Sequence, residues 1–367
     1  MQHNQVRFSN TNDKEIAATI RQRVNDYFDS RNISTKSNLQ MKVKSVVMIL
    51  LYFTPYFLML TGIVTNPWLC ALMWILMGFG MAGIGFSIMH DANHNSYSNK
   101  SGINKFLSLS MLTLGGSAVN WKIQHNTLHH GFTNIDGIDE DINSGILLRL
   151  SPNQKHYNFH RYQHYYAWFL YSLMTLYWFL GKDIPQLKRY RKMGLLSQQK
   201  TKYNRLMFNL VISKVMYGII FLGLPLLLID IPWWQTLIMF TTMHLLAGLL
   251  LGLVFQPAHV VSETEFPIPN EKGKIENNWV IHQLSTTANY APKGPVFSWL
   301  IGGLNFQIEH HLFANVCHVH YRKISHIVRE TALEYGLPYH VNRTFFSAIA
   351  DHARMLKNLG KYQEVLT

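Results

Sequence analysis

Long apolar stretches alternate with polar segments along this chain. Those at residues 45–65, 68–89, 208–229 and 233–255 can each cross a bilayer, which takes about 20 mainly apolar residues. Only Asn66-Pro67 separates the first two, and Asp230-Ile231-Pro232 separates the last two. Because such short breaks leave no room for another element, the pattern predicts two helical hairpins.

Two further apolar stretches, 106–119 and 166–180, are too short to span a bilayer. We expect them to lie at the membrane interface or to cap a cytoplasmic domain. Residues 12–31 carry apolar side chains every fourth position, which predicts a surface helix. Residues 1–44 are polar and contain no cleaved secretory signal.

The distribution of charge orients this arrangement. Both short connectors lack lysine and arginine, whereas the termini and the central segment are rich in them. The positive-inside rule then places the termini and the central segment in the cytoplasm. With this placement, the net charge of +13 indicates contact with anionic lipid headgroups and not with nucleic acid.

These patterns predict an all-α, multi-pass membrane protein with four transmembrane helices in two hairpins and a helical cytoplasmic domain. The expected division is a cytoplasmic N-terminal segment (1–44), a membrane domain (45–326) and a helical cytoplasmic tail (327–367). The two cysteines, Cys70 and Cys317, fit neither a disulfide framework nor a metal-binding spacing.

Seven histidines fall into three clusters beside the apolar stretches, and their spacing is suited to metal binding. The clusters are His90 with His94, His125 with His129 and His130, and His310 with His311. A separation of four residues stacks two rings on one helical face, whereas an adjacent residue is rotated by about 100°. His259, at the end of the fourth apolar stretch, is a candidate eighth ligand.

So many neutral nitrogen donors suit transition metals, and they exceed the four ligands of a structural zinc site. The sequence therefore predicts a centre of two metal ions in the cytoplasmic domain. It predicts no catalytic residue apart from those of this metal centre. Acidic and amide side chains are expected to orient the rings. The main candidates are Asp91, Asn126 and Glu309, and further neighbours are Asn93, Asp136, Asp139 and Asp141. Glu309 is alternatively a direct ligand.

The remaining histidines are interpreted as structural. His244 lies in the middle of an apolar stretch and is expected to form an interhelical hydrogen bond, although such a residue is also a functional candidate. His282 is a further candidate for orienting the ring of a metal ligand. The others are expected on an interfacial helix face (His156, His160, His164) or on the ordinary surface (His318, His320, His326).

The three clusters resemble the histidine boxes of membrane fatty acid desaturases. The third box begins with Gln307, which is typical of front-end acyl desaturases (linoleoyl-CoA desaturase-like), the enzymes that insert a double bond between an existing one and the carboxyl end. The flanking residues 302–306 and 255–259 also resemble that subgroup, and the likeness covers residues 45–326.

The resemblance implies a non-haem di-iron centre and O2-dependent desaturation of a long-chain acyl group carried by CoA, a carrier protein or a lipid ester. Gln307 stands where many relatives carry a ninth histidine and is a possible ligand. The implied metal ligands are His90, His94, His125, His129, His130, His259, Gln307, His310 and His311.

Many front-end relatives carry a fused b-type cytochrome with a His-Pro-Gly-Gly motif, which this sequence lacks. The resemblance therefore implies an external electron donor, such as a ferredoxin or a b-type cytochrome with its reductase. It also favours the bacterial inner membrane over the endoplasmic reticulum as the location.

Two alternatives remain at this level. Related histidine-box proteins hydroxylate lipids, and sphingolipid desaturases share the Gln-type third box, so product analysis is needed to separate these activities. A divalent-metal transporter would instead place its ligands in broken helices near the bilayer midplane. The clusters here are predicted at one membrane face, which argues against transport.

Overall fold

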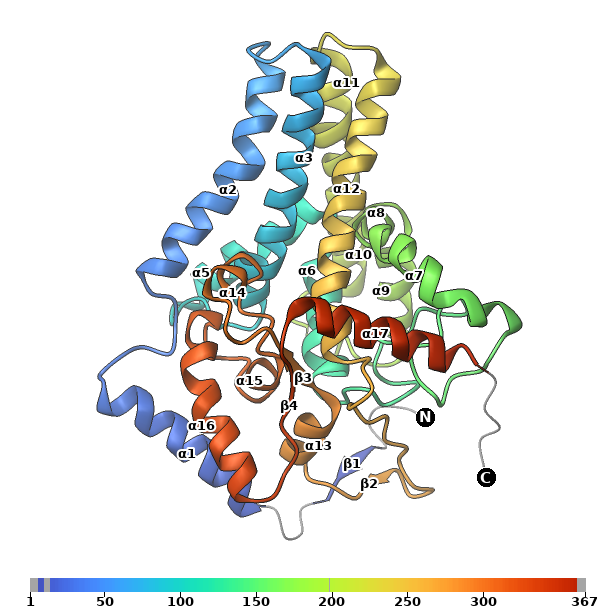
Figure 1. The fold of residues 1–367 in the computed structure, drawn as a ribbon. Helices are drawn as coiled ribbons and strands as arrows, with labels where there is room; N and C mark the ends of the chain where they lie inside the picture. Colours follow the sequence, from blue (N-terminus) through green and yellow to red (C-terminus); the bar gives the residue numbers. More distant parts are fainter. Residues whose placement is uncertain (1–5, 10–13, 198, 362–367) are drawn as a thin grey trace. The chain divides into compact units, whose positions relative to one another are not determined.

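The computed structural model describes residues 6–9, 14–197 and 199–361. It divides into two compact units. The first unit comprises Met1–Asn38, Gln124–Trp168 and Leu253–Thr367, and the second unit comprises Leu39–Ile123 and Phe169–Gly252. Each unit is mainly helical, and the strands are only two or three residues long (Figure 1). The predicted all-α class is confirmed.

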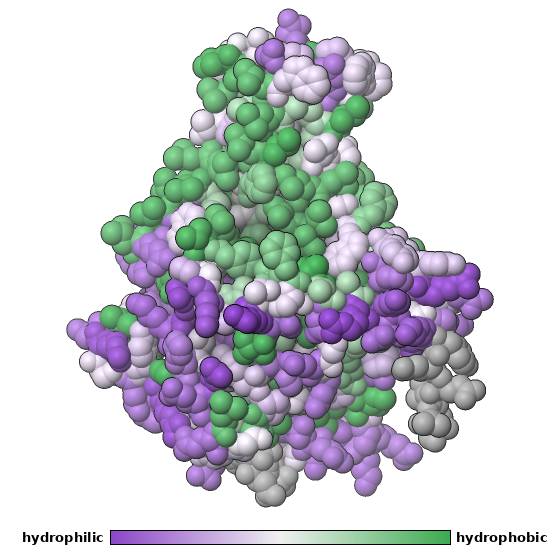
Figure 2. Space-filling view, viewed as in Figure 1, coloured by the Kyte–Doolittle hydropathy of each residue, from purple (hydrophilic) through white to green (hydrophobic). Residues whose placement is uncertain are grey.

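The second unit contains most of the four helical segments that are long and apolar enough to span a membrane. These are Leu39–Leu60, Pro67–Asn93, Tyr203–Leu228 and Trp233–Ala258. They match the four expected spans in number and order, with ends that differ by a few residues. Apolar side chains cover the visible face of these helices (Figure 2). Some of them are highly exposed, such as Leu227 with 80% of its surface exposed. Such exposure fits contact with lipid.

The first hairpin consists of α2 (Leu39–Leu60) and α3 (Pro67–Gly83), with α3 continued by η2 (Ile84–Met89) and α4 (His90–Asn93). The Asn66 side chain accepts hydrogen bonds from the backbone N–H groups of Trp68 and Leu69, while Pro67 occupies the first helical position. Both features start helices efficiently. The connector therefore ends one span and begins the next, as predicted.

The second hairpin consists of α10 (Tyr203–Gly218), η7 (Ile219–Gly223) and α11 (Leu224–Leu228), followed by α12 (Trp233–Phe255). In α12, His244 Nε2 lies 3.0 Å from the Tyr217 hydroxyl of α10. His244 Nδ1 lies 3.0 Å from Thr175 Oγ1 in α8 (Met174–Tyr177). The predicted interhelical hydrogen bonding of His244 is confirmed.

The two shorter apolar stretches form short helices, and neither is among the four spans found in the described residues. The stretch at 106–119 contributes to three short helices, and the stretch at 166–180 contributes to three others. Their bounds are α5 (Ser101–Ser108), η3 (Leu109–Leu114), α6 (Ala118–Trp121), α7 (Gln163–Ser172), α8 and η6 (Trp178–Lys182), and α9 (Asp183–Lys192) comes next.

The first unit has a core between its N-terminal and C-terminal helices. The apolar side chains Ile16, Ile20, Val24 and Phe28 lie along one side of α1 (Lys14–Ser30) and are buried with residues of α16 (Tyr321–Glu334). Figure 1 shows these two helices side by side. The helix expected at 12–31 is confirmed over its described part.

The first unit also contains short strands and further helices. Two parallel strand pairs join distant segments: β1 (Arg7–Phe8) with β2 (Lys274–Ile275), and β3 (Ala288–Tyr290) with β4 (His340–Asn342). The remaining helices are η4 (Lys122–His129), η5 (Asn158–Tyr162), η8 (Gln256–Ala258), α13 (Trp279–Thr286), α14 (Pro295–Leu300), α15 (Gln307–Leu312), η9 (His318–His320) and α17 (Phe345–Leu359).

Candidate metal centre

The second histidine cluster lies on a π-helical turn, η4, and the residue that follows it. The backbone N–H of His130 donates to the carbonyl of His125, five residues earlier, at 2.9 Å. This wider turn brings His125 and His130 to the same side, with their Nε2 atoms 3.3 Å apart. The expectation of α-helical geometry, which rotates His130 away, was wrong here. Single π-helical turns are frequent at functional sites.

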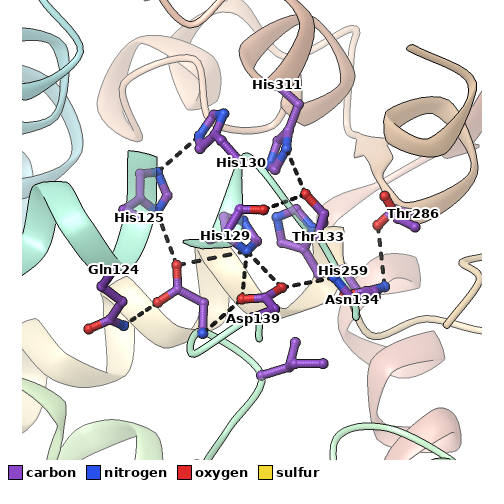
Figure 3. Close-up of polar contacts among 12 residues, drawn as sticks. Gln124, His125, His129, His130, Thr133, Asn134, Asp139, His259, Thr286 and His311 are labelled. Carbon is purple, nitrogen blue, oxygen red and sulfur yellow. Dashed lines mark hydrogen bonds and ion pairs between the residues drawn. The ribbon is translucent and has the colours of Figure 1, made fainter. Parts of the chain in front are cut away.

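Two carboxylates orient this cluster (Figure 3). The Nδ1–H of His129 donates to Asp139 at 3.0 Å, and that of His125 donates to Asp141 at 3.0 Å. Asp139 is held in turn by the backbone N–H groups of Asn134 and Asp141. A ring that donates from Nδ1 presents the lone pair of Nε2, which is the arrangement that metal ligation requires.

The electrostatics of His129 agree with this arrangement. Burial opposes a charged imidazole, but the charge and hydrogen bond of Asp139 outweigh it and raise the pKa of His129. The same carboxylate would stabilise any cation on the ring. The opposite nitrogen, His129 Nε2, is buried and has no hydrogen-bond partner within the described part of the chain.

The third cluster lies on α15 and meets the second. His310 Nε2 is 2.9 Å from His130 Nε2. The ring of His311 stacks on that of His130, with centroids 4.2 Å apart and 11° between the planes. Both histidines of α15 are buried. Sequence spacing alone could not place these rings together, since about 180 residues separate them.

Two of the groups of possible metal ligands share His311. One contains His130, His310 and His311, and the other contains His129, His259 and His311; the ligand atoms within each group lie within 4.8 Å of one another. Burial lowers the pKa of His259 well below its usual value, which favours the neutral ring. Neither of its nitrogens has a hydrogen-bond partner among the described residues. Buried, neutral and unpartnered nitrogens fit a metal site.

Gln307 and Glu309 differ in their surroundings. Gln307 is buried, and its Oε1 has no hydrogen-bond partner in the described residues. The Glu309 carboxylate accepts hydrogen bonds from Asn289 Nδ2 and the Tyr339 hydroxyl, both at 2.8 Å. Burial raises the pKa of Glu309 to about 7. With both oxygens engaged, Glu309 is placed to support α15.

The first cluster belongs to the second unit. The rings of His90 and His94 lie edge to face, with centroids 4.7 Å apart, and both contact the ring of Trp121. Asp91 Oδ1 is 3.7 Å from His90 Nδ1. The one-turn spacing therefore pairs the two rings as predicted. Their participation in a common metal centre stays a prediction, as does the orienting role of Asn126.

Sequence reasoning missed several neighbours of the boxes and misplaced two histidines. Gln283, Thr133, Asn289 and Tyr339 contact box residues, yet no local pattern distinguishes them. His318 and His320 are buried and not on the surface. His320 Nε2 instead bonds the carbonyl of Lys36 at 3.0 Å.

Comparison with known proteins decides the family. The family model described as fatty acid desaturase matches residues 66–343. The chain belongs to the fatty acid desaturase family. This desaturase is 35% identical over 355 residues to a sn-1 linoleoyl-lipid 6-desaturase of Synechocystis, covering 96% of this chain and 97% of that protein.

Two other relatives extend the comparison. A sn-1 linoleoyl-lipid 6-desaturase of Arthrospira platensis is 34% identical, covering 93% of this chain and 91% of that protein. An acyl-lipid (8-3)-desaturase of Physcomitrium patens is 33% identical, covering 97% of this chain and 74% of that protein. The protein is thus an integral membrane oxidoreductase that desaturates fatty acids, with buried histidine groups suited to a metal cofactor.

Proposed function

We propose that this desaturase inserts a double bond on the carboxyl side of an existing one in a lipid-linked polyunsaturated acyl chain. The main structural support for this reaction is the pair of histidine groups that share His311, because they are suited to binding a metal. The names of the Synechocystis and Arthrospira platensis relatives, which match nearly end to end, support a linoleoyl-lipid substrate. Two hydrogens leave neighbouring methylenes, and O2 with two electrons and two protons gives two waters.

Iron is the metal that we propose, with two ions bound. His125, His129, His130, His259, His310 and His311 would hold them in the first unit. By resemblance to the family's histidine boxes, His90 and His94 would complete the set, and Gln307 would contribute its buried Oε1. When bound, iron would supply O2 activation and removal of hydrogen from an unactivated carbon.

The protein's own residues would then provide orientation and protection from water. Asp139 and Asp141 hold the Nδ1 protons of His129 and His125, so that each Nε2 keeps its lone pair. Asn289 of strand β3 and Tyr339 hold the Glu309 carboxylate of α15. Because the histidines are buried, they lie outside bulk water.

The electron donor and the orientation are also proposals. We propose an external ferredoxin or b-type cytochrome as donor, and the cytoplasmic face of a bacterial inner membrane for the histidines and both termini. The lack of Lys and Arg in the connectors at Asn66 and Asp230 supports this orientation. Reporter fusions at the C-terminus and at the Asp230 connector should report opposite sides; the same side for both would reject it.

The activity is tested by expressing the chain in a host with defined lipids, feeding linoleate, and profiling fatty acids by mass spectrometry. We expect a new double bond between the carboxyl end and the existing one. The double variant His310→Ala, His311→Ala should abolish it, whereas His326→Ala, at an exposed histidine, should retain it. A hydroxylated product would instead indicate a lipid hydroxylase. No product, despite bound iron and a supplied reductase, would reject the proposed substrate.

A further inference from the structure

Gln283 is a buried amide between the second and third histidine boxes. It lies on α13, whose N-terminus is capped by Asn278, the side chain of which accepts from the Ile281 N–H at 2.9 Å. The Gln283 side chain has no exposed surface. A fully buried amide must find hydrogen-bond partners, because an unpaired one costs about 1–3 kcal/mol. Among the described residues, the partners of this amide are His130, Thr133 and His311, which belong to the second and third boxes or adjoin them.

The orientation of this amide follows from its contacts. Gln283 Nε2 donates to the carbonyl of His130 at 3.1 Å, and Gln283 Oε1 lies 2.7 Å from His311 Nδ1. Reversing the amide would place Oε1 against the His130 carbonyl, an oxygen–oxygen contact without a proton. The Thr133 hydroxyl, 2.9 Å from Oε1, can donate to it in the observed orientation. The position of the oxygen is therefore decided by its neighbours.

This orientation sets the tautomer of His311. An amide oxygen only accepts hydrogen bonds, so the proton of the His311 ring must lie on Nδ1. His311 Nε2 then carries the lone pair. Asp139 has the same effect on His129 through a carboxylate, whereas Gln283 acts without adding a charge. The same residue also anchors His130, whose carbonyl receives a second hydrogen bond from Trp279 Nε1 at 3.0 Å.

We propose that Gln283 is a positioning residue that joins the second box to the third and holds His311 in its metal-binding tautomer. It would act through His311 and not as a ligand itself. The inference rests on the proposed function, because His311 must be a metal ligand. His311 belongs to two of the ligand groups, and its one free lone pair, on Nε2, would be misdirected by an error in its ring orientation.

The test compares Gln283→Leu with a matched control, Gln163→Leu. Gln163 is also fully buried in the first unit and is hydrogen-bonded to the backbone of Arg149 and Leu356. Among the described residues, it has no side-chain hydrogen bond to a box histidine. Both variants lose a buried amide, and both should unfold at lower temperature. Only Gln283→Leu should change metal binding.

The readout is Co²⁺ titration of the purified, detergent-solubilised protein, followed by visible absorption and by metal content per chain. We expect Gln283→Leu to weaken metal binding by about 10–100-fold and to change the Co²⁺ spectrum. Gln283→Glu keeps an acceptor oxygen towards His311, and in its protonated form it can also donate to the His130 carbonyl. It should therefore recover part of the affinity, which also covers a failure of the leucine variant to fold. Gln163→Leu should show the wild-type spectrum and affinity.

Wild-type affinity and spectrum in folded Gln283→Leu would overturn the role of Gln283 while leaving the metal centre intact. An equal loss in Gln163→Leu would also overturn it, since the effect would then be one of general stability. If the wild-type protein itself bound no metal, the proposed metal centre would be rejected, and with it the proposed role of Gln283.

Discussion

At the scale of single residues, the chemistry of the histidines is set by what faces their Nδ1 atoms. Asp139 faces His129, Asp141 faces His125 and Gln283 faces His311. In each case an oxygen accepts the Nδ1 proton, so Nε2 is left for a metal. The rings are therefore arranged for metal binding by side chains outside the boxes.

Replacing Asp139 by Asn tests this arrangement. The amide oxygen can still accept from His129, but the negative charge that favours a cation on the ring is lost. We expect metal affinity to fall by about 10–100-fold, measured as iron retained per chain during dialysis against a chelator. Asp136→Asn, in the same loop but with no bond to a box histidine among the described residues, is the control. Equal iron retention in both variants would contradict the role of Asp139.

At the scale of elements, the close approach of α2 and α3 depends on small residues. A Cβ atom added to Gly80 would lie 2.7 Å from the backbone nitrogen of Tyr52 and 2.9 Å from the carbonyl carbon of Leu51. Backbone atoms cannot turn away as a side chain can, so the helices would have to separate. Small residues at helix contacts are the usual means of tight packing in membranes.

We therefore expect Gly80→Ala to destabilise the protein by about 1–3 kcal/mol, the usual cost of overpacking. Thermal unfolding in detergent, followed by circular dichroism, measures the effect. Gly102→Ala in α5 is the control, because an added Cβ there meets nothing within 4 Å. An unchanged melting temperature for Gly80→Ala would show that the hairpin does not need this close contact.

Two π-helical turns show the limit of prediction for elements. Apolar length identified the spans, but η2 before His90 and η4 at His125 were not predicted. A π turn costs regular hydrogen-bond geometry and is maintained by the surrounding packing. The contact between His125 and His130 depends on this turn, so the local spacing of the second box was necessary but not sufficient to place its rings.

At the scale of the whole molecule, buried neutral histidines make the stability of the fold dependent on pH. His352 on α17 is buried, and its Nδ1–H donates to the carbonyl of Val260 at 2.7 Å. Burial lowers the pKa of His352 to about 4, below the value of about 6.5 in an unfolded chain. Between these values the unfolded chain binds a proton that the folded protein does not.

Stability should therefore fall as the pH drops from about 6.5 to 4, with His352 contributing a loss of about 3 kcal/mol at most. Denaturant unfolding at a series of pH values measures this slope. His352→Gln keeps a donor near Val260 but cannot titrate, so its stability should vary less across this range. An identical slope in the variant would show that His352 stays neutral in both states or is charged in both.

The sequence by itself determined the four spans and their two hairpins, the three histidine boxes and the family resemblance. These are local properties, since hydropathy, turn residues and the spacing of histidines are read over a few turns of chain. Only the tertiary structure decided that His130 meets His310, that His311 belongs to two groups, and that Gln283 orients it. Those partners lie far apart in sequence, and their contact depends on how the intervening helices pack, which no short pattern encodes.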